Sequence, residues 1–259
     1  MQTIERTHVQ PGVRPPGPPP STRQCARVLS VLSPLIRALR PKYYGFEALP
    51  GARPLMFVGN HQLLALDTPF LVAELWRRGL LVRPLVDDFM FALGPLAEVL
   101  TSLGVVHADP ATASALLARG ECILVYPGGS REATKGSGHP FKLEWWDRLG
   151  FAQIALRHRC PVVPVAAVGV DDAVRVLLGR EQYLRGSIKR LVDRLGIRHD
   201  LLPPLVVPRR RPCPAFKLGS PITLDHFEGH DPESAARRLR VEVATAIEVE
   251  LAWLLRRGG

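Results

Sequence analysis

Two continuous apolar runs limit most strongly what this chain can fold into. They span residues 122–126 and 162–168, and turn-forming or charged residues bound each of them. A strand of this length that is apolar on both faces is typical of a parallel sheet covered by helices on both sides. Further strands are expected at 55–58, 81–86, 105–107 and 216–218.

Helical patterns separate these strands. They are expected at 25–40, 68–78, 89–103 with a break at 94–95, 109–120, 144–158, and from 231 to the end of the chain. Strands that alternate with helices at this rhythm predict an α/β fold. We therefore expect a single domain with a mixed, mostly parallel central sheet flanked by helices.

Composition narrows the class of protein. An apolar fraction of 46% in 259 residues suffices for one large domain, and the net charge of +10 calls for an acidic partner. Four widely spaced cysteines (Cys25, Cys122, Cys160, Cys213) argue against a zinc site or a disulfide framework and favour a reducing compartment. No apolar run approaches the roughly 18 residues of a membrane-spanning helix, and the polar start lacks a signal-peptide core. We expect a cytoplasmic protein, peripheral on the cytosolic face of a membrane.

The ends of the chain and its charge suggest a finer organisation. Residues 1–24 are rich in proline and are expected to be a disordered tail, so the folded domain would span 25–259. The helix at 25–40 is expected either to pack on the core or to lie in a lipid interface. Residues 173–217 hold eleven Lys and Arg against three acids, above leucines at helical spacing. This basic amphipathic segment is expected to face an anionic membrane, although a solvated basic face is the alternative.

A histidine and an aspartate follow the first predicted buried strand. His61 lies in the turn after that strand, and Asp67 stands six positions later at the start of the next helix. Loops at the carboxyl ends of strands carry the chemistry of open α/β sheets. If Asp67 holds one ring nitrogen of His61, the other nitrogen can accept a proton. A polar turn with a helix-capping aspartate is the alternative interpretation.

The run Tyr126-Pro127-Gly128-Gly129-Ser130-Arg131-Glu132 follows the second buried strand. A glycine turn in this place can present backbone N–H groups to an oxyanion, or it can be an ordinary tight turn. Two further runs follow in order, 162–165 (Val-Val-Pro-Val) and 219–222 (Gly-Ser-Pro-Ile).

Taken in order, these motifs resemble those of the glycerolipid acyltransferase (PlsC-type) superfamily. The likeness covers roughly residues 50–225, and the Pro-Gly-Gly-x-Arg-Glu form is most similar to the type-2 diacylglycerol acyltransferases and the phytyl ester synthases. The resemblance implies a glycerol-3-phosphate acyltransferase-like fold and an O-acyltransferase. That enzyme would move a fatty acyl group from a thioester donor, acyl-CoA or acyl carrier protein, to the hydroxyl of a lipid alcohol.

The resemblance also implies roles for particular residues. His61 would be the general base and Asp67 its orienting partner, without an acyl-enzyme, a metal or a cofactor. Substrate would contact a set of residues around the two motifs: Asn60, Gly128, Gly129, Ser130, Arg131 and Glu132. Gly128 departs from the usual Phe-Pro-Glu-Gly form, and no arginine stands between 107 and 112. Both departures favour a neutral acceptor over a phosphorylated one.

Three other functions remain open. A 1-acylglycerol-3-phosphate acyltransferase would use a phosphorylated acceptor. A serine hydrolase would use Ser130, although its run lacks the final glycine of a nucleophile elbow. A non-catalytic lipid-binding module would not need His61. Nucleic acid is not expected as a partner, because the basic segment holds few aromatic residues and no reader motif.

Overall fold

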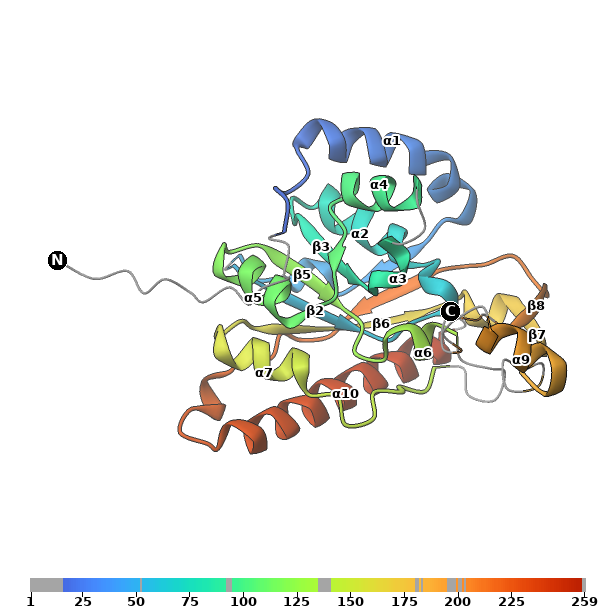
Figure 1. Ribbon diagram of the computed structural model, residues 1–259. Helices are drawn as coiled ribbons and strands as arrows, with labels where there is room; N and C mark the ends of the chain where they lie inside the picture. Colours follow the sequence, from blue (N-terminus) through green and yellow to red (C-terminus); the bar gives the residue numbers. More distant parts are fainter. Residues whose placement is uncertain are drawn as a thin grey trace.

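A seven-stranded sheet forms the centre of the protein (Figure 1). The computed structural model describes residues 16–51, 53–91, 95–134, 141–179, 184–194 and 204–257, with Gln182, His199 and Leu202. The strand order is β1-β9-β6-β2-β5-β3-β4. The bounds are Lys42–Tyr44 (β1), Met56–Gly59 (β2), Val82–Val86 (β3), Val106–His107 (β4), Cys122–Val125 (β5), Val162–Val168 (β6) and Ala215–Leu218 (β9).

Five of these strands run parallel, from β6 to β4 in the sheet order. Strand β9 pairs antiparallel with β6, and β1 pairs parallel with β9. Strands β1 and β9 therefore run opposite to the other five. The predicted α/β fold with a mixed, mostly parallel sheet is thereby confirmed.

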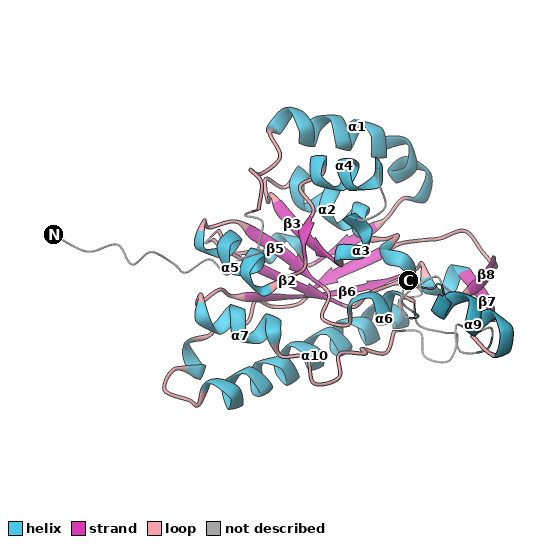
Figure 2. Cartoon of the chain, in the orientation of Figure 1, coloured by secondary structure: helices cyan, strands magenta, loops and turns pink. Residues whose placement is uncertain are grey.

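Helices cover both faces of the sheet (Figure 2). One face carries α1, α2, α3 and α4, and the other carries α5, α7 and α10, while α6 follows β5 directly. The bounds are Thr22–Leu39 (α1), Thr68–Arg77 (α2), Asp88–Phe91 (α3), Pro95–Ser102 (α4), Pro110–Ala118 (α5), Gly129–Ala133 (α6), Gly150–Arg157 (α7), Gly186–Arg194 (α9) and Pro232–Arg256 (α10).

Alternation along the central strands divides the interior into two cores. In β2, Met56 and Val58 point to the core under α5, α7 and α10, whereas Phe57 points to the core under α2. Successive side chains of a strand face opposite sides, so a strand between two helical layers is apolar at every position. This explains the continuous runs in the sequence and keeps β2, β5 and β6 fixed at the centre.

Two predicted helices differ from the structure. The helix expected at 144–158 begins only at Gly150, because Trp145 and Trp146 lie in the preceding turn. The prediction of leucines at helical spacing in residues 173–217, of which Leu177 is the first, is also wrong at its start. Residues Val174–Leu178 form strand β7, which pairs antiparallel with β8 (Leu205–Pro208), and the helix there is α9 alone. Residues 195–198 of the basic segment lie outside the described residues.

The amino-terminal boundary also lies earlier than expected. Helix α1 begins at Thr22 with a capping box between Ser21 and Gln24, and the segment before it lies against the body. Arg83 is buried, pairs with Glu121 at 3.1 Å, and donates to the carbonyl of Gly17 at 2.9 Å. Residues 16–24 therefore belong to the described structure and do not form a disordered tail, and residues 1–15 lie outside the described residues.

Helix α1 contacts the core, as one of its two expectations has it, and a position in a lipid interface stays a prediction. One stripe of α1 packs against the core under α2, while Val31 and Leu35 on another stripe are exposed. No helix in the described part of the chain is long and apolar enough to cross a membrane.

Candidate active site

The loop that follows β2 is tied to the neighbouring strand by Asn60. This side chain is fully buried, and its amide donates to the carbonyl of Ala167 at 2.9 Å and accepts from the N–H of Ala167 at 2.8 Å. Both ends of the amide are thus paired with the backbone of β6. The structure assigns Asn60 to holding the loop, where the sequence suggested a substrate contact.

Gln62, which the sequence did not single out, forms a second tie. Its buried carbonyl oxygen accepts from the N–H of Val170 at 2.9 Å, and its Nε2 donates to Asp67 Oδ2 at 3.1 Å. Asp67 starts α2 as expected, but its carboxylate makes no capping hydrogen bond. The Oδ1 atom of Asp67 is buried without a hydrogen-bond partner among the described residues.

His61 lies between Asn60 and Gln62 on the loop. Its backbone N–H donates to Glu132 Oε1 at 3.2 Å, and its Nδ1 lies 3.3 Å from the carbonyl oxygen of Gln62. A carbonyl oxygen only accepts, so this contact assigns the proton to Nδ1 and leaves a lone pair on Nε2. The ring therefore has the tautomer of a general base.

Tyr126 lies against His61 and beside Thr68, the residue that follows Asp67. Its ring stacks on His61 with the centroids 4.4 Å apart, and its hydroxyl pairs with Thr68 Oγ1 at 2.9 Å. Burial raises the pKa of Tyr126, and the charge of Asp67 raises it further. The phenol consequently stays protonated, with Asp67 close by and His61 against its face.

The second motif, residues 126–132, lies on the glycine turn and on α6. Gly129 and Ser130 border the same cavity as His61, whereas Glu132 is fully buried beneath the loop. The N–H of Gly129 donates to the carbonyl of Tyr126 at 3.0 Å, so this donor is already paired within the turn. Arg131 is exposed and lies over the ring of Trp146.

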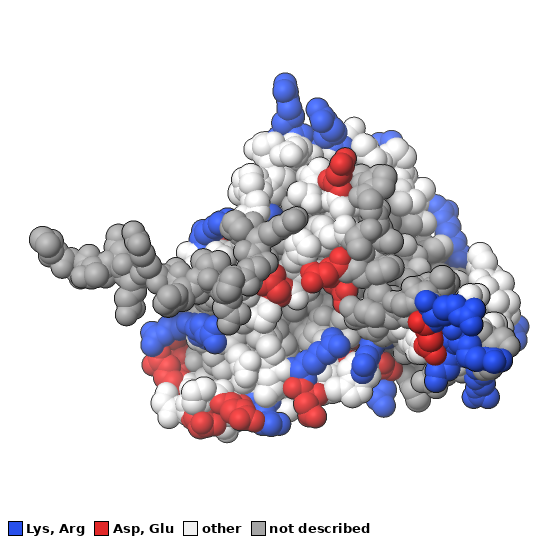
Figure 3. Space-filling view, viewed as in Figure 1, with Lys and Arg blue, Asp and Glu red and all other residues white. Residues whose placement is uncertain are grey.

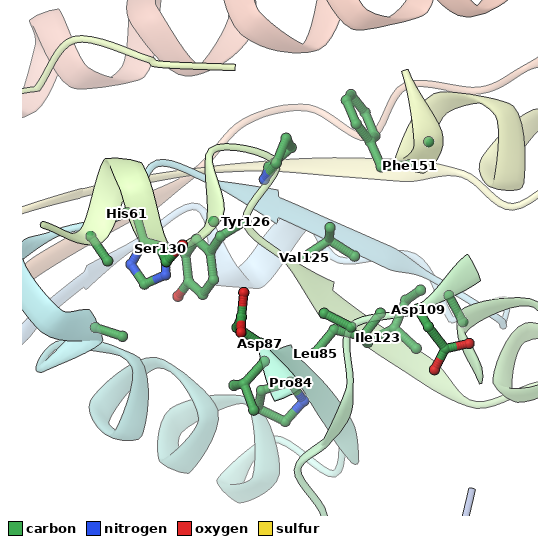
Figure 4. Close-up of a pocket in the computed structure, with 18 of the residues that line it drawn as sticks. His61, Pro84, Leu85, Asp87, Asp109, Ile123, Val125, Tyr126, Ser130 and Phe151 are labelled. Carbon is green, nitrogen blue, oxygen red and sulfur yellow. The ribbon is translucent and has the colours of Figure 1, made fainter. Parts of the chain in front are cut away.

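A cavity of about 740 Å³ opens beside His61. Figure 4 shows His61, Tyr126 and Ser130 together at one end, Asp109 at the other, and apolar side chains such as Val125 and Leu85 between them. Phe151 and other core residues continue the apolar wall. A mostly apolar cleft with a few convergent polar groups is the usual form of a small-molecule site.

Charge is divided unevenly around this cavity. Three carboxylates line it, from Asp87, Asp88 and Asp109, and Arg148 is the only Lys or Arg among the described residues of the lining. Asp109 also caps α5 by accepting from the N–H of Thr112, and Asp88 pairs with His107 at 2.7 Å. An anionic ligand group would thus be favoured near Arg148 and disfavoured near the carboxylates.

Comparisons with known proteins agree with this geometry. Residues 40–168 match the family model described as Acyltransferase, a stretch that includes His61, Asp67 and the glycine turn. The chain belongs to the acyltransferase family. Its fold is also that of a solved 1-acyl-sn-glycerophosphate acyltransferase from Thermotoga maritima, with a TM-score of 0.53 at 18% identity over 89% of this chain and 79% of that one.

Two of the curated relatives are named for lipid synthesis. A "DGAT1/2-independent enzyme synthesizing storage lipids" from Gallus gallus is 31% identical over 209 residues, which is 79% of this chain and 57% of that protein. "Phytyl ester synthase 1, chloroplastic" from Arabidopsis thaliana is 24% identical over 238 residues, which is 82% of this chain and 34% of that protein. The chain thus spans well under two thirds of the length of these relatives.

The burial of Asp67 yields a prediction that separates stability from activity. Burial raises its pKa from 3.8 to about 7, so the folded protein binds this proton more tightly than the unfolded chain. Stability should therefore fall as pH rises from about 4 to 7, because the unfolded chain ionises first. At 1.36 kcal/mol per pKa unit the upper bound is roughly 4 kcal/mol.

Asp67→Asn should remove this loss of stability and also slow catalysis. We expect a higher free energy of unfolding than wild type at pH 8, little difference at pH 4, and slower acyl transfer. Urea unfolding at both pH values measures the first effect, with the exposed Asp225→Asn as control. A variant that is less stable than wild type at pH 8 would contradict the assignment.

Proposed function

We propose that the protein is an O-acyltransferase that moves a fatty acyl group from a thioester to the hydroxyl of a lipid alcohol. The observation that supports this most directly is the position of His61. The base stands at the polar end of a long, mostly apolar cavity, with the buried Asp67 behind its loop. The names of the relatives, which synthesise storage lipids or phytyl esters, fit a lipid alcohol as acceptor.

The proposed reaction needs one base and no acyl-enzyme. Nε2 of His61 takes the hydroxyl proton while the hydroxyl oxygen attacks the thioester carbonyl. The tetrahedral intermediate then collapses, the C–S bond breaks, and the imidazolium returns its proton to the thiolate. Asp67, when ionised, stabilises the imidazolium, and the stacked ring of Tyr126 limits rotation of His61.

The hydroxyl groups of Thr68 and Tyr126 are the proposed polar contacts for the reacting groups. Both residues line the cavity beside His61, and the two hydroxyls share a hydrogen bond in which either can donate. One of them can therefore turn a proton toward a substrate oxygen without leaving its partner. Ser130 borders the same end of the cavity and can contribute a further hydrogen bond.

Removing the base tests the mechanism. We expect His61→Ala to lower kcat by roughly 10²–10⁴-fold while the fold is kept, because general-base catalysis is worth about that much. The assay is transfer of labelled palmitate from palmitoyl-CoA to oleyl alcohol, with the melting temperature as the check on folding. The exposed His230→Ala is the matched control.

The same assay separates the alternatives. A well-folded His61→Ala protein with wild-type transfer would eliminate the proposed base, and a lipid-binding module would show no transfer at all. Ser130 lies close enough to the base to be considered as a nucleophile. If Ser130→Ala abolishes transfer and wild type forms an acyl-serine, the reaction is that of a serine enzyme.

The lining of the cavity favours a neutral acceptor. Lysophosphatidate brings about two negative charges, and a charge placed among the carboxylates of Asp87, Asp88 and Asp109 would be repelled. A diacylglycerol or a long-chain alcohol needs only the apolar wall and a polar contact at its hydroxyl. Arg131 lies outside the lining, over Trp146, and so does not offset the three carboxylates there.

We therefore expect a higher kcat/KM for dioleoylglycerol or oleyl alcohol than for lysophosphatidate. Rates with a saturating acyl donor and each acceptor in the same mixed micelles provide the measurement. Asp87→Asn should improve the use of lysophosphatidate, since it removes one repelling charge. A higher kcat/KM for lysophosphatidate that is lost in Arg131→Ala would show that the site holds a phosphate.

A membrane surface is the proposed source of the acceptor. Strands β7 and β8 and helix α9 expose aliphatic side chains: Leu177, Leu178, Ile188, Leu191, Leu205 and Val207. Lys and Arg side chains gather over α9 (Figure 3), among them Lys189, Arg190 and Arg194. Exposed aliphatic groups flanked by cations are suited to an anionic bilayer.

Binding to vesicles should follow this charge. We expect the protein to sediment with vesicles containing 30% phosphatidylserine and to be released as salt rises, because salt screens the attraction. At about 1 kcal/mol per cation, replacing Lys189, Arg190 and Arg194 by Gln should weaken binding by tenfold or more. The control replaces Arg157, Arg159 and Arg238. Equal binding to neutral and anionic vesicles would refute the prediction.

A further inference from the structure

An arginine–tryptophan platform, formed by Arg131, Trp146 and Arg148, stands beside the mouth of the cavity. The indole of Trp146 is 47% exposed, and the guanidinium carbons of Arg131 and Arg148 lie 5.4 Å and 5.9 Å from its ring. The half-exposed ring and the two cations together offer a ligand a stacking surface and positive charge.

The platform is held in place from three sides. Nη1 of Arg148 donates to the carbonyl of Pro127 at 2.9 Å, which attaches it to the glycine turn. Arg240, on α10, donates to the carbonyl of Trp146, and Arg131 projects from α6. The guanidinium group of Arg148 therefore has a fixed position, which lowers the entropy cost of binding an anion.

The platform is continuous with the reactive end of the cavity. Arg148 lines the cavity together with His61, Gly129 and Ser130. Asp147, next to Trp146 in the sequence, is exposed. Its charge, after that of Glu233, helps to raise the pKa of Arg237. A ligand that reaches His61 from this side would thus pass Arg131 and the ring of Trp146 outside the cavity, and Arg148 in its lining.

We propose that the platform binds the phosphate groups and adenine of an acyl-CoA donor. Guanidinium groups bind phosphate oxygens in pairs, and an indole offers a stacking surface for a nucleobase. The pantetheine arm would then lead the thioester past Arg148 to His61. This inference rests on the proposed acyl transfer and adds the chemical class of its donor.

Binding of free CoA tests the platform without requiring catalysis. We expect titration calorimetry to show that Trp146→Ala and Arg148→Gln each weaken CoA binding by about tenfold, as loss of a stacking contact or of a charge-assisted contact does. The control Arg157→Gln, on α7, should bind CoA as wild type does. Pantetheine, which lacks the phosphates and the adenine, should bind far more weakly than CoA to wild type. Wild-type affinity in both platform variants would overturn the proposal.

Donor kinetics test the same contact during turnover. We expect Arg148→Gln to raise KM about tenfold for palmitoyl-CoA and to leave KM unchanged for S-palmitoyl pantetheine. An equal loss with both donors would mean that Arg148 only supports the glycine turn, and would overturn the proposal. A lower KM for palmitoyl-acyl carrier protein than for palmitoyl-CoA would also overturn it. If CoA binds as expected but no alcohol is acylated, the platform stands and the proposed acyl transfer fails.

Discussion

Three buried polar side chains fix the loop that carries His61, and the site depends on them. Asn60 pairs with the backbone of β6, Gln62 joins Val170 to Asp67, and Glu132 accepts from the N–H of His61. A buried polar group left unpaired costs about 1–3 kcal/mol, so each tie strongly favours one loop conformation. Because the partners come from distant parts of the sequence, His61 reaches its position only when β6 and α6 are already in place.

These ties hold a backbone that would otherwise relax. Leu64 and Ala65 have φ angles of 52° and 56°, in the left-handed region that residues with a side chain seldom occupy. Such conformations cost of order 1–3 kcal/mol each and persist only where the surroundings determine them. The N–H of Leu63 donates to Asp171 at 2.6 Å just before this stretch. The strain turns the chain sharply after His61, which lets Leu64 and Ala65 border the cavity beside the base.

The sequence predicted the fold well where the pattern reflects burial, and less well elsewhere. Strand β6 lies at its predicted residues, because an apolar run between two helical layers leaves little choice. The helix prediction failed at residues 174–178 because Leu177 is exposed, so its spacing from the later leucines marks no buried helix face. His61 and Asp67 could be selected by motif. The roles of Gln62 and Arg148 could not, since both depend on contacts far along the chain.

The departure at Gly128 has a local cause in the packing of Glu132. A Cβ atom at position 128 would lie 1.8 Å from Oε2 of Glu132, so no other residue fits while that carboxylate supports the loop. Gly128 and Glu132 therefore form one arrangement, in which a glutamate at position 128 is excluded by the glutamate four residues later. The glycine is consequently explained by the way in which the loop of His61 is supported, and it gives little information about the acceptor. The case for a neutral acceptor must rest on the carboxylates of Asp87, Asp88 and Asp109, which face the space where the acceptor would lie.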